Sequence, residues 1–173
     1  SDLNQIISKN IKNLSFYNDL SKPNKIDQST FIDGLEHNKL VFINGRIEKI
    51  EFDYEEKNKI EILDTYEVDQ KLQSINSLVT LNNVFKSKNH RIIVKKNYSL
   101  QKPLIIYNTT NNKISSKNLN LSLNFVLEEN SSLKLINISD DNSGCNFINN
   151  YYSFQLKDNS ILKNYNVDLK TNK

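Results

Sequence analysis

Only one residue of this sequence carries a thiol. Cys145 follows the polar run 140–144 (DDNSG), and a thiol at the end of a loop could accept sulfur or ligate a metal. A metal site needs several ligands, and no histidine or second cysteine lies near it in the sequence. A reactive thiolate would also need a nearby cation or a helix N-terminus, which the sequence does not provide. We therefore expect no metal site and interpret Cys145 as an incidental thiol near the start of a strand.

The other ionisable residues lack the spacing of a catalytic or metal site. His37 and His90 have no companion three or four residues away, so both are expected to be exposed loop residues. The acidic pair 140–141 lacks the alternating oxygen ligands of a calcium loop. The adjacent glutamates 55–56 and 128–129 would face opposite ways on a strand and could not share a substrate. With 3 glycines there is no phosphate-binding loop, and the sequence predicts a protein that is not an enzyme.

Composition excludes several classes of partner. The chain has 173 residues, enough for one sizeable core, and its 23 basic and 20 acidic residues are interleaved to a net charge of +3. We therefore expect no nucleic-acid partner. No run approaches the ~20 apolar residues of a membrane span, and the first residues lack the features of a signal peptide, which predicts a cytoplasmic protein with no membrane contact. Methionine is absent, so we expect either that an initiating methionine was removed or that the sequence is a piece of a longer chain.

The first half of the sequence predicts helices around a β-hairpin. Apolar residues recur every three or four positions in two segments, as in amphipathic helices. Asn44 and Gly45 tolerate the positive φ values of a type I′ turn, which predicts a hairpin. The expected elements are a helix at 2–20, strands at 40–43 and 46–52, a short strand at 59–63 and a helix at 69–86. We assign residues 1–88 to an N-terminal helical region that contains this hairpin.

After residue 88 the sequence changes to short β-rich runs separated by polar turns. The expected strands are 91–95, 104–108, 119–127, 133–139, 147–156 and 162–169. We assign residues 89–173 to a second, all-β region.

Three segments of this second region repeat one pattern of apolar, variable, apolar, two charged, Asn, two variable and a final aliphatic residue. They are 92–100 (IIVKKNYSL), 125–133 (FVLEENSSL) and 154–162 (FQLKDNSIL). Asn97, Asn130 and Asn159 stand where the chain is expected to turn with positive φ, which Asn adopts more readily than other residues with a side chain. The apolar residues beside each turn are expected to stack from coil to coil in a shared interior.

This repeat predicts a β-helix, because a recurring strand-turn-strand unit usually indicates a solenoid. The intervals of 33 and 29 residues between the turn asparagines are unequal, which favours a loose β-helix with turns of varying length. A β-sandwich built of hairpins is the alternative fold.

Several segments, taken in order, resemble the SufB/SufD family of iron-sulfur cluster assembly proteins. They are 40–46 (LVFINGR), 81–85 (LNNVF), 93–104 (IVKKNYSLQKPL) and 125–133 (FVLEENSSL). Asn97 and Asn130 stand where the family has glycine. Each motif is short, and the specificity comes from their order and spacing over residues 40–162.

The resemblance implies a mainly β fold, with an N-terminal α-helical region and a right-handed parallel β-helix left partial and open-ended. It implies a non-catalytic scaffold subunit, closest to SufD, that partners SufB and the ATPase SufC. It also implies that this fragment binds no cofactor itself, while an iron-sulfur cluster is associated with the full complex. Family members are much longer, so most of the surface that contacts SufC and SufB would lie beyond residue 173.

Three other functions remain open. A SufB-like subunit of the same complex is one, although the LVFINGR hairpin favours SufD. A β-helical carbohydrate-binding or adhesin domain would need an exposed aromatic ladder, for which Tyr151 and Tyr152 are the only adjacent aromatics of the β region. A β-helical polysaccharide lyase or hydrolase would need converging carboxylates, yet the equivalent positions 95, 128 and 157 are Lys, Glu and Lys.

Overall fold

The computed structural model describes residues 25–26, 31–65, 78–79, 82, 89–114, 117–140 and 147–168. These residues form nine β-strands, which make two sheets, and one short 3-10 helix. In chain order the elements are β1 Asn38–Ile43, β2 Arg46–Glu51, β3 Ile60–Thr65, β4 Asn89–Val94, β5 Leu104–Thr109, η3 Asn112–Ile114, β6 Asn118–Leu127, β7 Ser132–Asp140, β8 Phe147–Leu156 and β9 Ile161–Asp168.

The prediction of a mainly β chain with parallel strands is confirmed. All six strands predicted after residue 88 are present, and each end lies within two residues of its predicted position. The predicted helix at 2–20 lies outside the described residues. So does most of the predicted helix at 69–86, of which Leu78, Val79 and Asn82 are described and have helical backbone.

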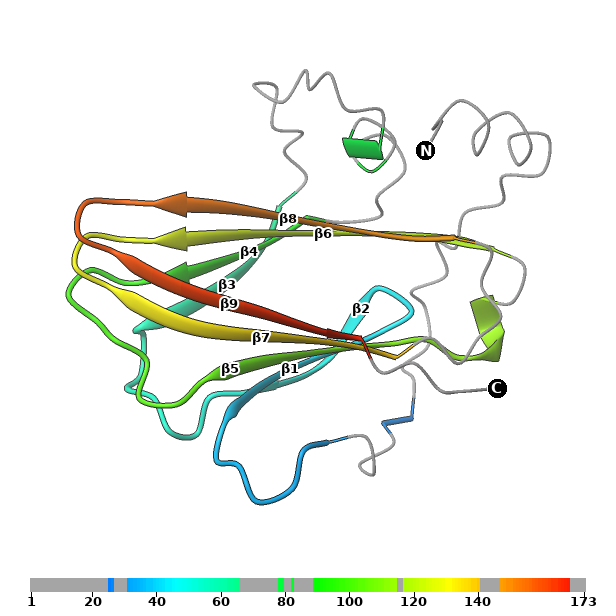
Figure 1. Ribbon diagram of the computed structural model, residues 1–173, viewed down its shortest axis with the longest axis horizontal. Helices are drawn as coiled ribbons and strands as arrows, with labels where there is room; N and C mark the ends of the chain where they lie inside the picture. Colours follow the sequence, from blue (N-terminus) through cyan, green and yellow to red (C-terminus); the bar gives the residue numbers. More distant parts are fainter. Residues whose placement is uncertain are drawn as a thin grey trace.

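Consecutive strands of the second region alternate between two sheets. One sheet has the order β3-β4-β6-β8 and the other has the order β2-β1-β5-β7-β9. Within each sheet, each strand from β4 to β7 pairs in parallel with the strand two places later in the chain. Figure 1 shows the two sheets facing each other, with β8 and β6 in one layer and β9, β7 and β5 in the other.

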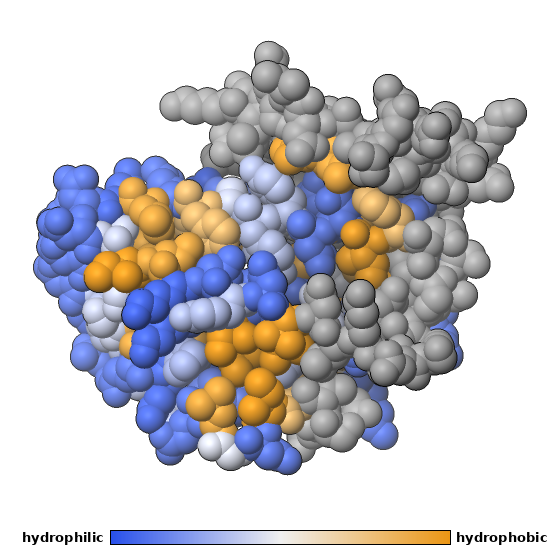
Figure 2. All heavy atoms as spheres, viewed as in Figure 1, coloured by the Kyte–Doolittle hydropathy of each residue, from blue (hydrophilic) through white to orange (hydrophobic). Residues whose placement is uncertain are grey.

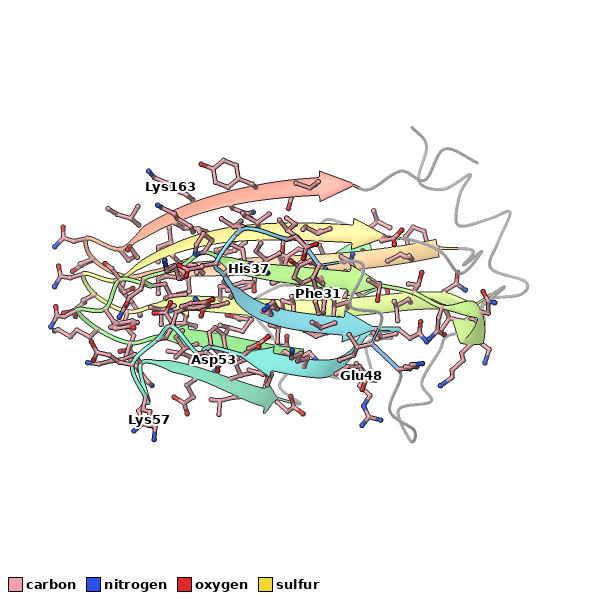
Figure 3. The ribbon with its side chains drawn as sticks, turned by 90° about the horizontal axis from the view of Figure 1, so that it is seen from below. Phe31, His37, Glu48, Asp53, Lys57 and Lys163 are labelled. Atoms are coloured by element: carbon pink, nitrogen blue, oxygen red, sulfur yellow. The ribbon has the colours of Figure 1, made fainter. Side chains whose placement is uncertain are left out.

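The direction of the outermost strands differs between the two edges of the sheets. At one edge the antiparallel strands β2 and β3 pair with β1 and β4. At the other edge lie β8 and β9, each paired in parallel with one neighbour. Figure 3 shows this direction, with Lys163 of β9 at one extreme and Lys57, which precedes β3, at the other. Strands from both sides of the predicted boundary at residue 88 therefore share both sheets.

The main core lies between the sheets. Side chains on a strand point alternately to its two faces, so every second residue of β6, from Leu121 to Leu127, faces the other sheet. Four such positions of β6 are buried, as are Leu133 and Leu135 on β7 and Leu40 and Phe42 on β1. Burying each of these large side chains stabilises the fold by about 1.5–3 kcal/mol.

A second apolar cluster lies on the outer face of the larger sheet. Val41, Ile105 and Tyr107 are buried there, and Ile26 and Phe31 from the preceding segment pack on them. The Phe31 and Tyr107 rings are 4.8 Å apart. Strands covered on both faces read as continuous apolar runs, which explains why LVFI of β1 and LIIY of β5 show no alternation.

Candidate functional site

The three turn asparagines lie directly above one another. Asn97, Asn130 and Asn159 have φ values of 58°, 55° and 56°, in the left-handed region that they were predicted to adopt. One hydrogen bond joins the side-chain amides of each neighbouring pair. Asn130 Nδ2 donates to Asn97 Oδ1 (2.9 Å), and Asn159 Nδ2 donates to Asn130 Oδ1 (3.2 Å). The sequence signal identified the turns, but it gave no indication of this side-chain ladder.

Backbone hydrogen bonds continue the ladder through the turns. The N–H of Asn97 donates to Glu129 O (2.8 Å), and the N–H of Asn130 donates to Asp158 O (3.0 Å). The lysines before Asn97 add ion pairs, Lys96 with Glu129 before the next turn asparagine and Lys95 with Glu61 of β3 (2.6 Å). The pKa of Lys95 is raised by its hydrogen bond to Glu61. These turns hold the parallel strands beside them in one register.

The predicted hairpin turn is also a point of contact between distant segments. Asn44 and Gly45 have φ values of 52° and 78°. Asn44 is buried, its Nδ2 donates to Asn111 Oδ1 (2.8 Å), and the N–H of Asn111 donates back to Asn44 Oδ1 (3.0 Å). A Cβ on Gly45 would lie 2.9 Å from Leu119 Cδ1. The turn therefore docks against the start of β6.

A loop carboxylate that the sequence reasoning dismissed is an anchor of the fold. Glu55 accepts hydrogen bonds from Tyr98 Oη (2.6 Å), Asn38 Nδ2 (2.6 Å) and the backbone N–H groups of Gln101 (3.1 Å) and Lys102 (3.2 Å). The pKa of Tyr98 is raised, first by burial and then by this bond to Glu55. These donors come from two segments, the start of β1 and the loop that follows β4, so Glu55 holds the β2–β3 loop against both. From the sequence, the adjacent glutamates 55–56 could not share a substrate. The sequence gives no sign that Glu55 instead has a structural role.

Both histidines are buried, which corrects the expectation that they are exposed loop residues. His37 is 3% exposed; its Nδ1–H donates to Leu35 O (2.5 Å), so its Nε2 accepts from Tyr107 Oη (2.8 Å). Tyr107 Oη also accepts from the N–H of Ile32 (3.2 Å). His90 is 4% exposed, and its Nδ1 lies 2.8 Å from Asp64 Oδ1. Polar partners let both imidazoles be buried, and the side-chain partners Tyr107 and Asp64 are distant in sequence from the histidines that they contact.

Amide side chains lie in the interior between the two sheets, where the sequence predicted only apolar contacts. Asn137 of β7 is 4% exposed, and its Nδ2 donates to Asn164 Oδ1 and to Asn166 Oδ1 of β9, both at 2.9 Å. Asn108 Nδ2 on β5 donates to Tyr152 Oη on β8 (2.7 Å), a bond that spans the two sheets. These amides carry no charge, so they can supply hydrogen bonds but no acid, base or nucleophile.

Tyr152 is held in its neutral form by this interior. Burial raises the pKa of its hydroxyl to about 12, and the hydrogen bond from Asn108 offsets only part of that effect. A phenol with so high a pKa cannot act as a base near neutral pH. Next to these residues lies a cavity of about 40 Å³ lined by Asn108, Thr110, Leu119, Ser139, Asn150 and others. Its size suits water molecules better than an organic substrate.

At the edge of the two sheets formed by β8 and β9, some side chains are exposed although the equivalent side chains of the neighbouring strands are buried between the sheets. Phe154 and Leu156 pair in register with Phe125 and Leu127, which are both 0% exposed, yet they are themselves 37% and 49% exposed. The Phe125 and Phe154 rings stack at 5.3 Å. Figure 1 views the stack from this side, and Figure 2 shows hydrophobic surface there between β8 and β9. We name this surface, formed by β8, β9 and the turn between them, the β8–β9 end.

Cys145 lies outside the described residues, as does Asp141 of the acidic pair 140–141. Across the ranges that the structure does describe, no three His, Cys, Asp or Glu side chains come together as a metal site. A helix long and apolar enough to cross a membrane is likewise not found among them. What the geometry brings together is a ladder of turns, an interior amide cluster and the β8–β9 end. No known family model and no curated protein matches this sequence.

Proposed function

We propose that this chain is a non-catalytic, SufD-like scaffold subunit of a cytoplasmic Suf iron-sulfur assembly system, and that its two sheets are the coils of a right-handed parallel β-helix. The observation that carries the proposal is the stacking of Asn97, Asn130 and Asn159 in one register. Two of these residues stand at glycine positions of the SufB/SufD motifs. The positive φ that they share is the property for which asparagine can replace glycine.

The strand order supports the β-helix part of this proposal. Strands that alternate between two sheets, and that pair in parallel with the strand two places later, follow the path of a coiled chain. A β-sandwich built of hairpins would instead place neighbouring strands antiparallel in one sheet. Crossovers between parallel strands of one sheet are right-handed in nearly all proteins, which supports that hand here.

The chemistry of the described residues supports a binding role over a catalytic one. The interior holds neutral amides and a tyrosine whose pKa is about 12, and the carboxylate of Glu55 is used to join loops. The adhesin alternative gains little from Tyr151 and Tyr152. Tyr152 is internal and bonded to Asn108, so the two tyrosines do not form an exposed ladder. A rigid surface for other proteins is the function that these features fit best.

The test is co-expression of the complete protein that carries this sequence with SufB and SufC from the same genome, followed by capture through a tag on this protein. We expect SufB and SufC to be retained in fixed proportion after washing at high salt, because scaffold interfaces bury large surfaces. An unrelated β-rich protein with the same tag is the control. Retention of neither partner would contradict the proposal.

A further inference from the structure

The side-chain amide of Asn108 has a partner for only one of its two polar atoms. Asn108 is 9% exposed, and its Nδ2 donates to Tyr152 Oη (2.7 Å) across the two sheets. Its Oδ1 is buried and accepts no hydrogen bond from the residues that the structure describes. Tyr152 Oη can satisfy one atom of this amide but not both, even if the amide nitrogen and oxygen are exchanged. Native proteins nearly always supply a partner for such a buried atom.

A cavity of about 40 Å³ lies beside this amide. It lies between the ends of β5 and β7 and the starts of β6 and β8, so its walls come from both sheets. The polar part of its wall includes Asn108, Ser139 and Asn150, and the apolar part includes Leu119 and Ile148. A buried water molecule needs about 10–15 Å³ of such a space, so about three can fit.

Three polar side chains from different strands converge on this cavity. Asn108 of β5 and Ser139 of β7 are register partners on neighbouring parallel strands, so their side chains lie on the same face of the sheet. Asn150 lies two residues before Tyr152 on β8, so it shares the interior face with the tyrosine that Asn108 contacts. A molecule in the cavity can therefore contact Asn108 and polar groups of both sheets at once.

The chemistry of the lining favours water over a metal ion or an apolar molecule. Amides and hydroxyls both donate and accept hydrogen bonds, as water does. Calcium takes about six to eight oxygen ligands, whereas Asp140 is the only charged residue among the described residues that line the cavity. An apolar molecule would leave the amide of Asn108 with an unpaired atom.

We propose that this cavity is a binding site for ordered water, in which a water molecule forms a hydrogen bond with the amide of Asn108 and links it to Ser139 and Asn150. The bound water supplies the second partner of that amide. It adds a polar link between the two sheets beside the bond from Asn108 to Tyr152. The site does not depend on the Suf partnership.

The first test is a crystal structure of this chain at a resolution that shows ordered water, with a second crystal held under xenon gas. We expect density in the cavity at about 2.7–3.2 Å from the amide of Asn108 and from Ser139 or Asn150, and no xenon there. Xenon binds dry apolar cavities, so xenon in this cavity would overturn the proposal. A cavity without density would also overturn it, as would density at the distance of about 2.3–2.6 Å that calcium keeps from its oxygen ligands.

The second test, in solution, removes one hydroxyl group from the cavity wall. Ser139→Ala deletes a hydrogen-bond partner of the water, so we expect the midpoint of urea unfolding to fall by about 0.3–1 M. If the hydroxyl of Ser139 faced a dry cavity, its removal would leave the midpoint unchanged or raise it, and either result would overturn the proposal.

The matched control is Ser153→Ala, which makes the same change on the opposite face of β8 from Tyr152 and should leave the midpoint nearly unchanged. An equal fall in Ser153→Ala would mean that the cavity is not the cause of the loss in Ser139→Ala, and it would count against the proposal.

Discussion

Asparagine at the three turns has two separable roles. It adopts a positive φ that costs most residues about 1–2 kcal/mol, and its amide side chain forms a hydrogen bond with the asparagine of the neighbouring turn. The first role could be predicted from the sequence, because an asparagine that follows two charged residues between apolar runs indicates a turn. The second could not, because the partners are 33 and 29 residues apart and only the register brings them together.

Substitutions at Asn130 should separate these roles. Asn130→Ala loses both, so we expect the free energy of unfolding to fall by about 1–2 kcal/mol. Asn130→Gly keeps the turn and loses only the exposed amide bonds, so its cost should be under about 1 kcal/mol. Urea unfolding measures both values, with Lys134→Ala on the exposed face of β7 as the control. Equal losses for alanine and glycine would show that the turn conformation contributes nothing.

The raised pKa of Tyr152 predicts how the free energy of unfolding changes at alkaline pH. Its pKa is about 12 in the folded chain against 10.0 ordinarily, so the folded state favours the neutral phenol. The corresponding stability is fully present below pH 10 and is lost as the pH rises from 10 to 12, a total of about 3 kcal/mol. Tyr152→Phe cannot ionise, so the pH dependence of its unfolding free energy should be shallower over this range.

The measurement is urea unfolding at a series of pH values above 9, compared between Tyr152→Phe and the unmodified chain. Tyr165→Phe, which removes an exposed hydroxyl, is the matched control and should keep the original slope. An unchanged slope in Tyr152→Phe would mean that its hydroxyl ionises as readily in the folded chain as in the unfolded one.

At the scale of elements, the sequence predicted the strands well and their partners poorly. Alternation and apolar runs gave the six strands after residue 88, and Asn44-Gly45 gave the hairpin. Nothing local indicated that β1 would pair in parallel with β5, because strand pairing is decided by contacts across the whole sheet. The interior position of Asn137 was missed for the same reason, since an asparagine within a strand looks like a surface residue.

The hairpin turn offers a test of how tightly β1 and β2 dock on β6. Gly45 and Gly34 both have positive φ, 78° and 75°, but only Gly45 lies against another side chain, that of Leu119. Gly34→Ala should therefore cost about 1–2 kcal/mol from backbone strain alone. Gly45→Ala should cost about 1 kcal/mol more, because the buried Leu119 must move.

Urea unfolding measures how much unfolding free energy is lost in Gly34→Ala and in Gly45→Ala. Repeating Gly45→Ala in a Leu119→Ala background should remove most of the extra cost, since the side chain that the new methyl group meets is gone. Equal costs at the two glycines, or no change in the Leu119→Ala background, would mean that the turn does not press on β6.

For the whole molecule, one arrangement accounts for the order of the strands, the ladder of turns and the contrast between the two ends of the stack. The turn asparagines recur at intervals of 33 and 29 residues, and the strands beside them alternate between the two sheets. The charged strands β2 and β3 form one edge of the two sheets, and at the other edge apolar side chains of β8 and β9 such as Phe154, Leu156 and Ile161 are exposed. This arrangement agrees with the scaffold role proposed above.

The proposed role in iron-sulfur assembly is tested most directly by the activity of an iron-sulfur enzyme in cells of the source organism depleted of this protein. We predict that this activity falls while that of an enzyme without a cluster in the same extract is unchanged, and that re-expression of the protein restores it. Unchanged iron-sulfur enzyme activity after complete depletion would contradict the claim.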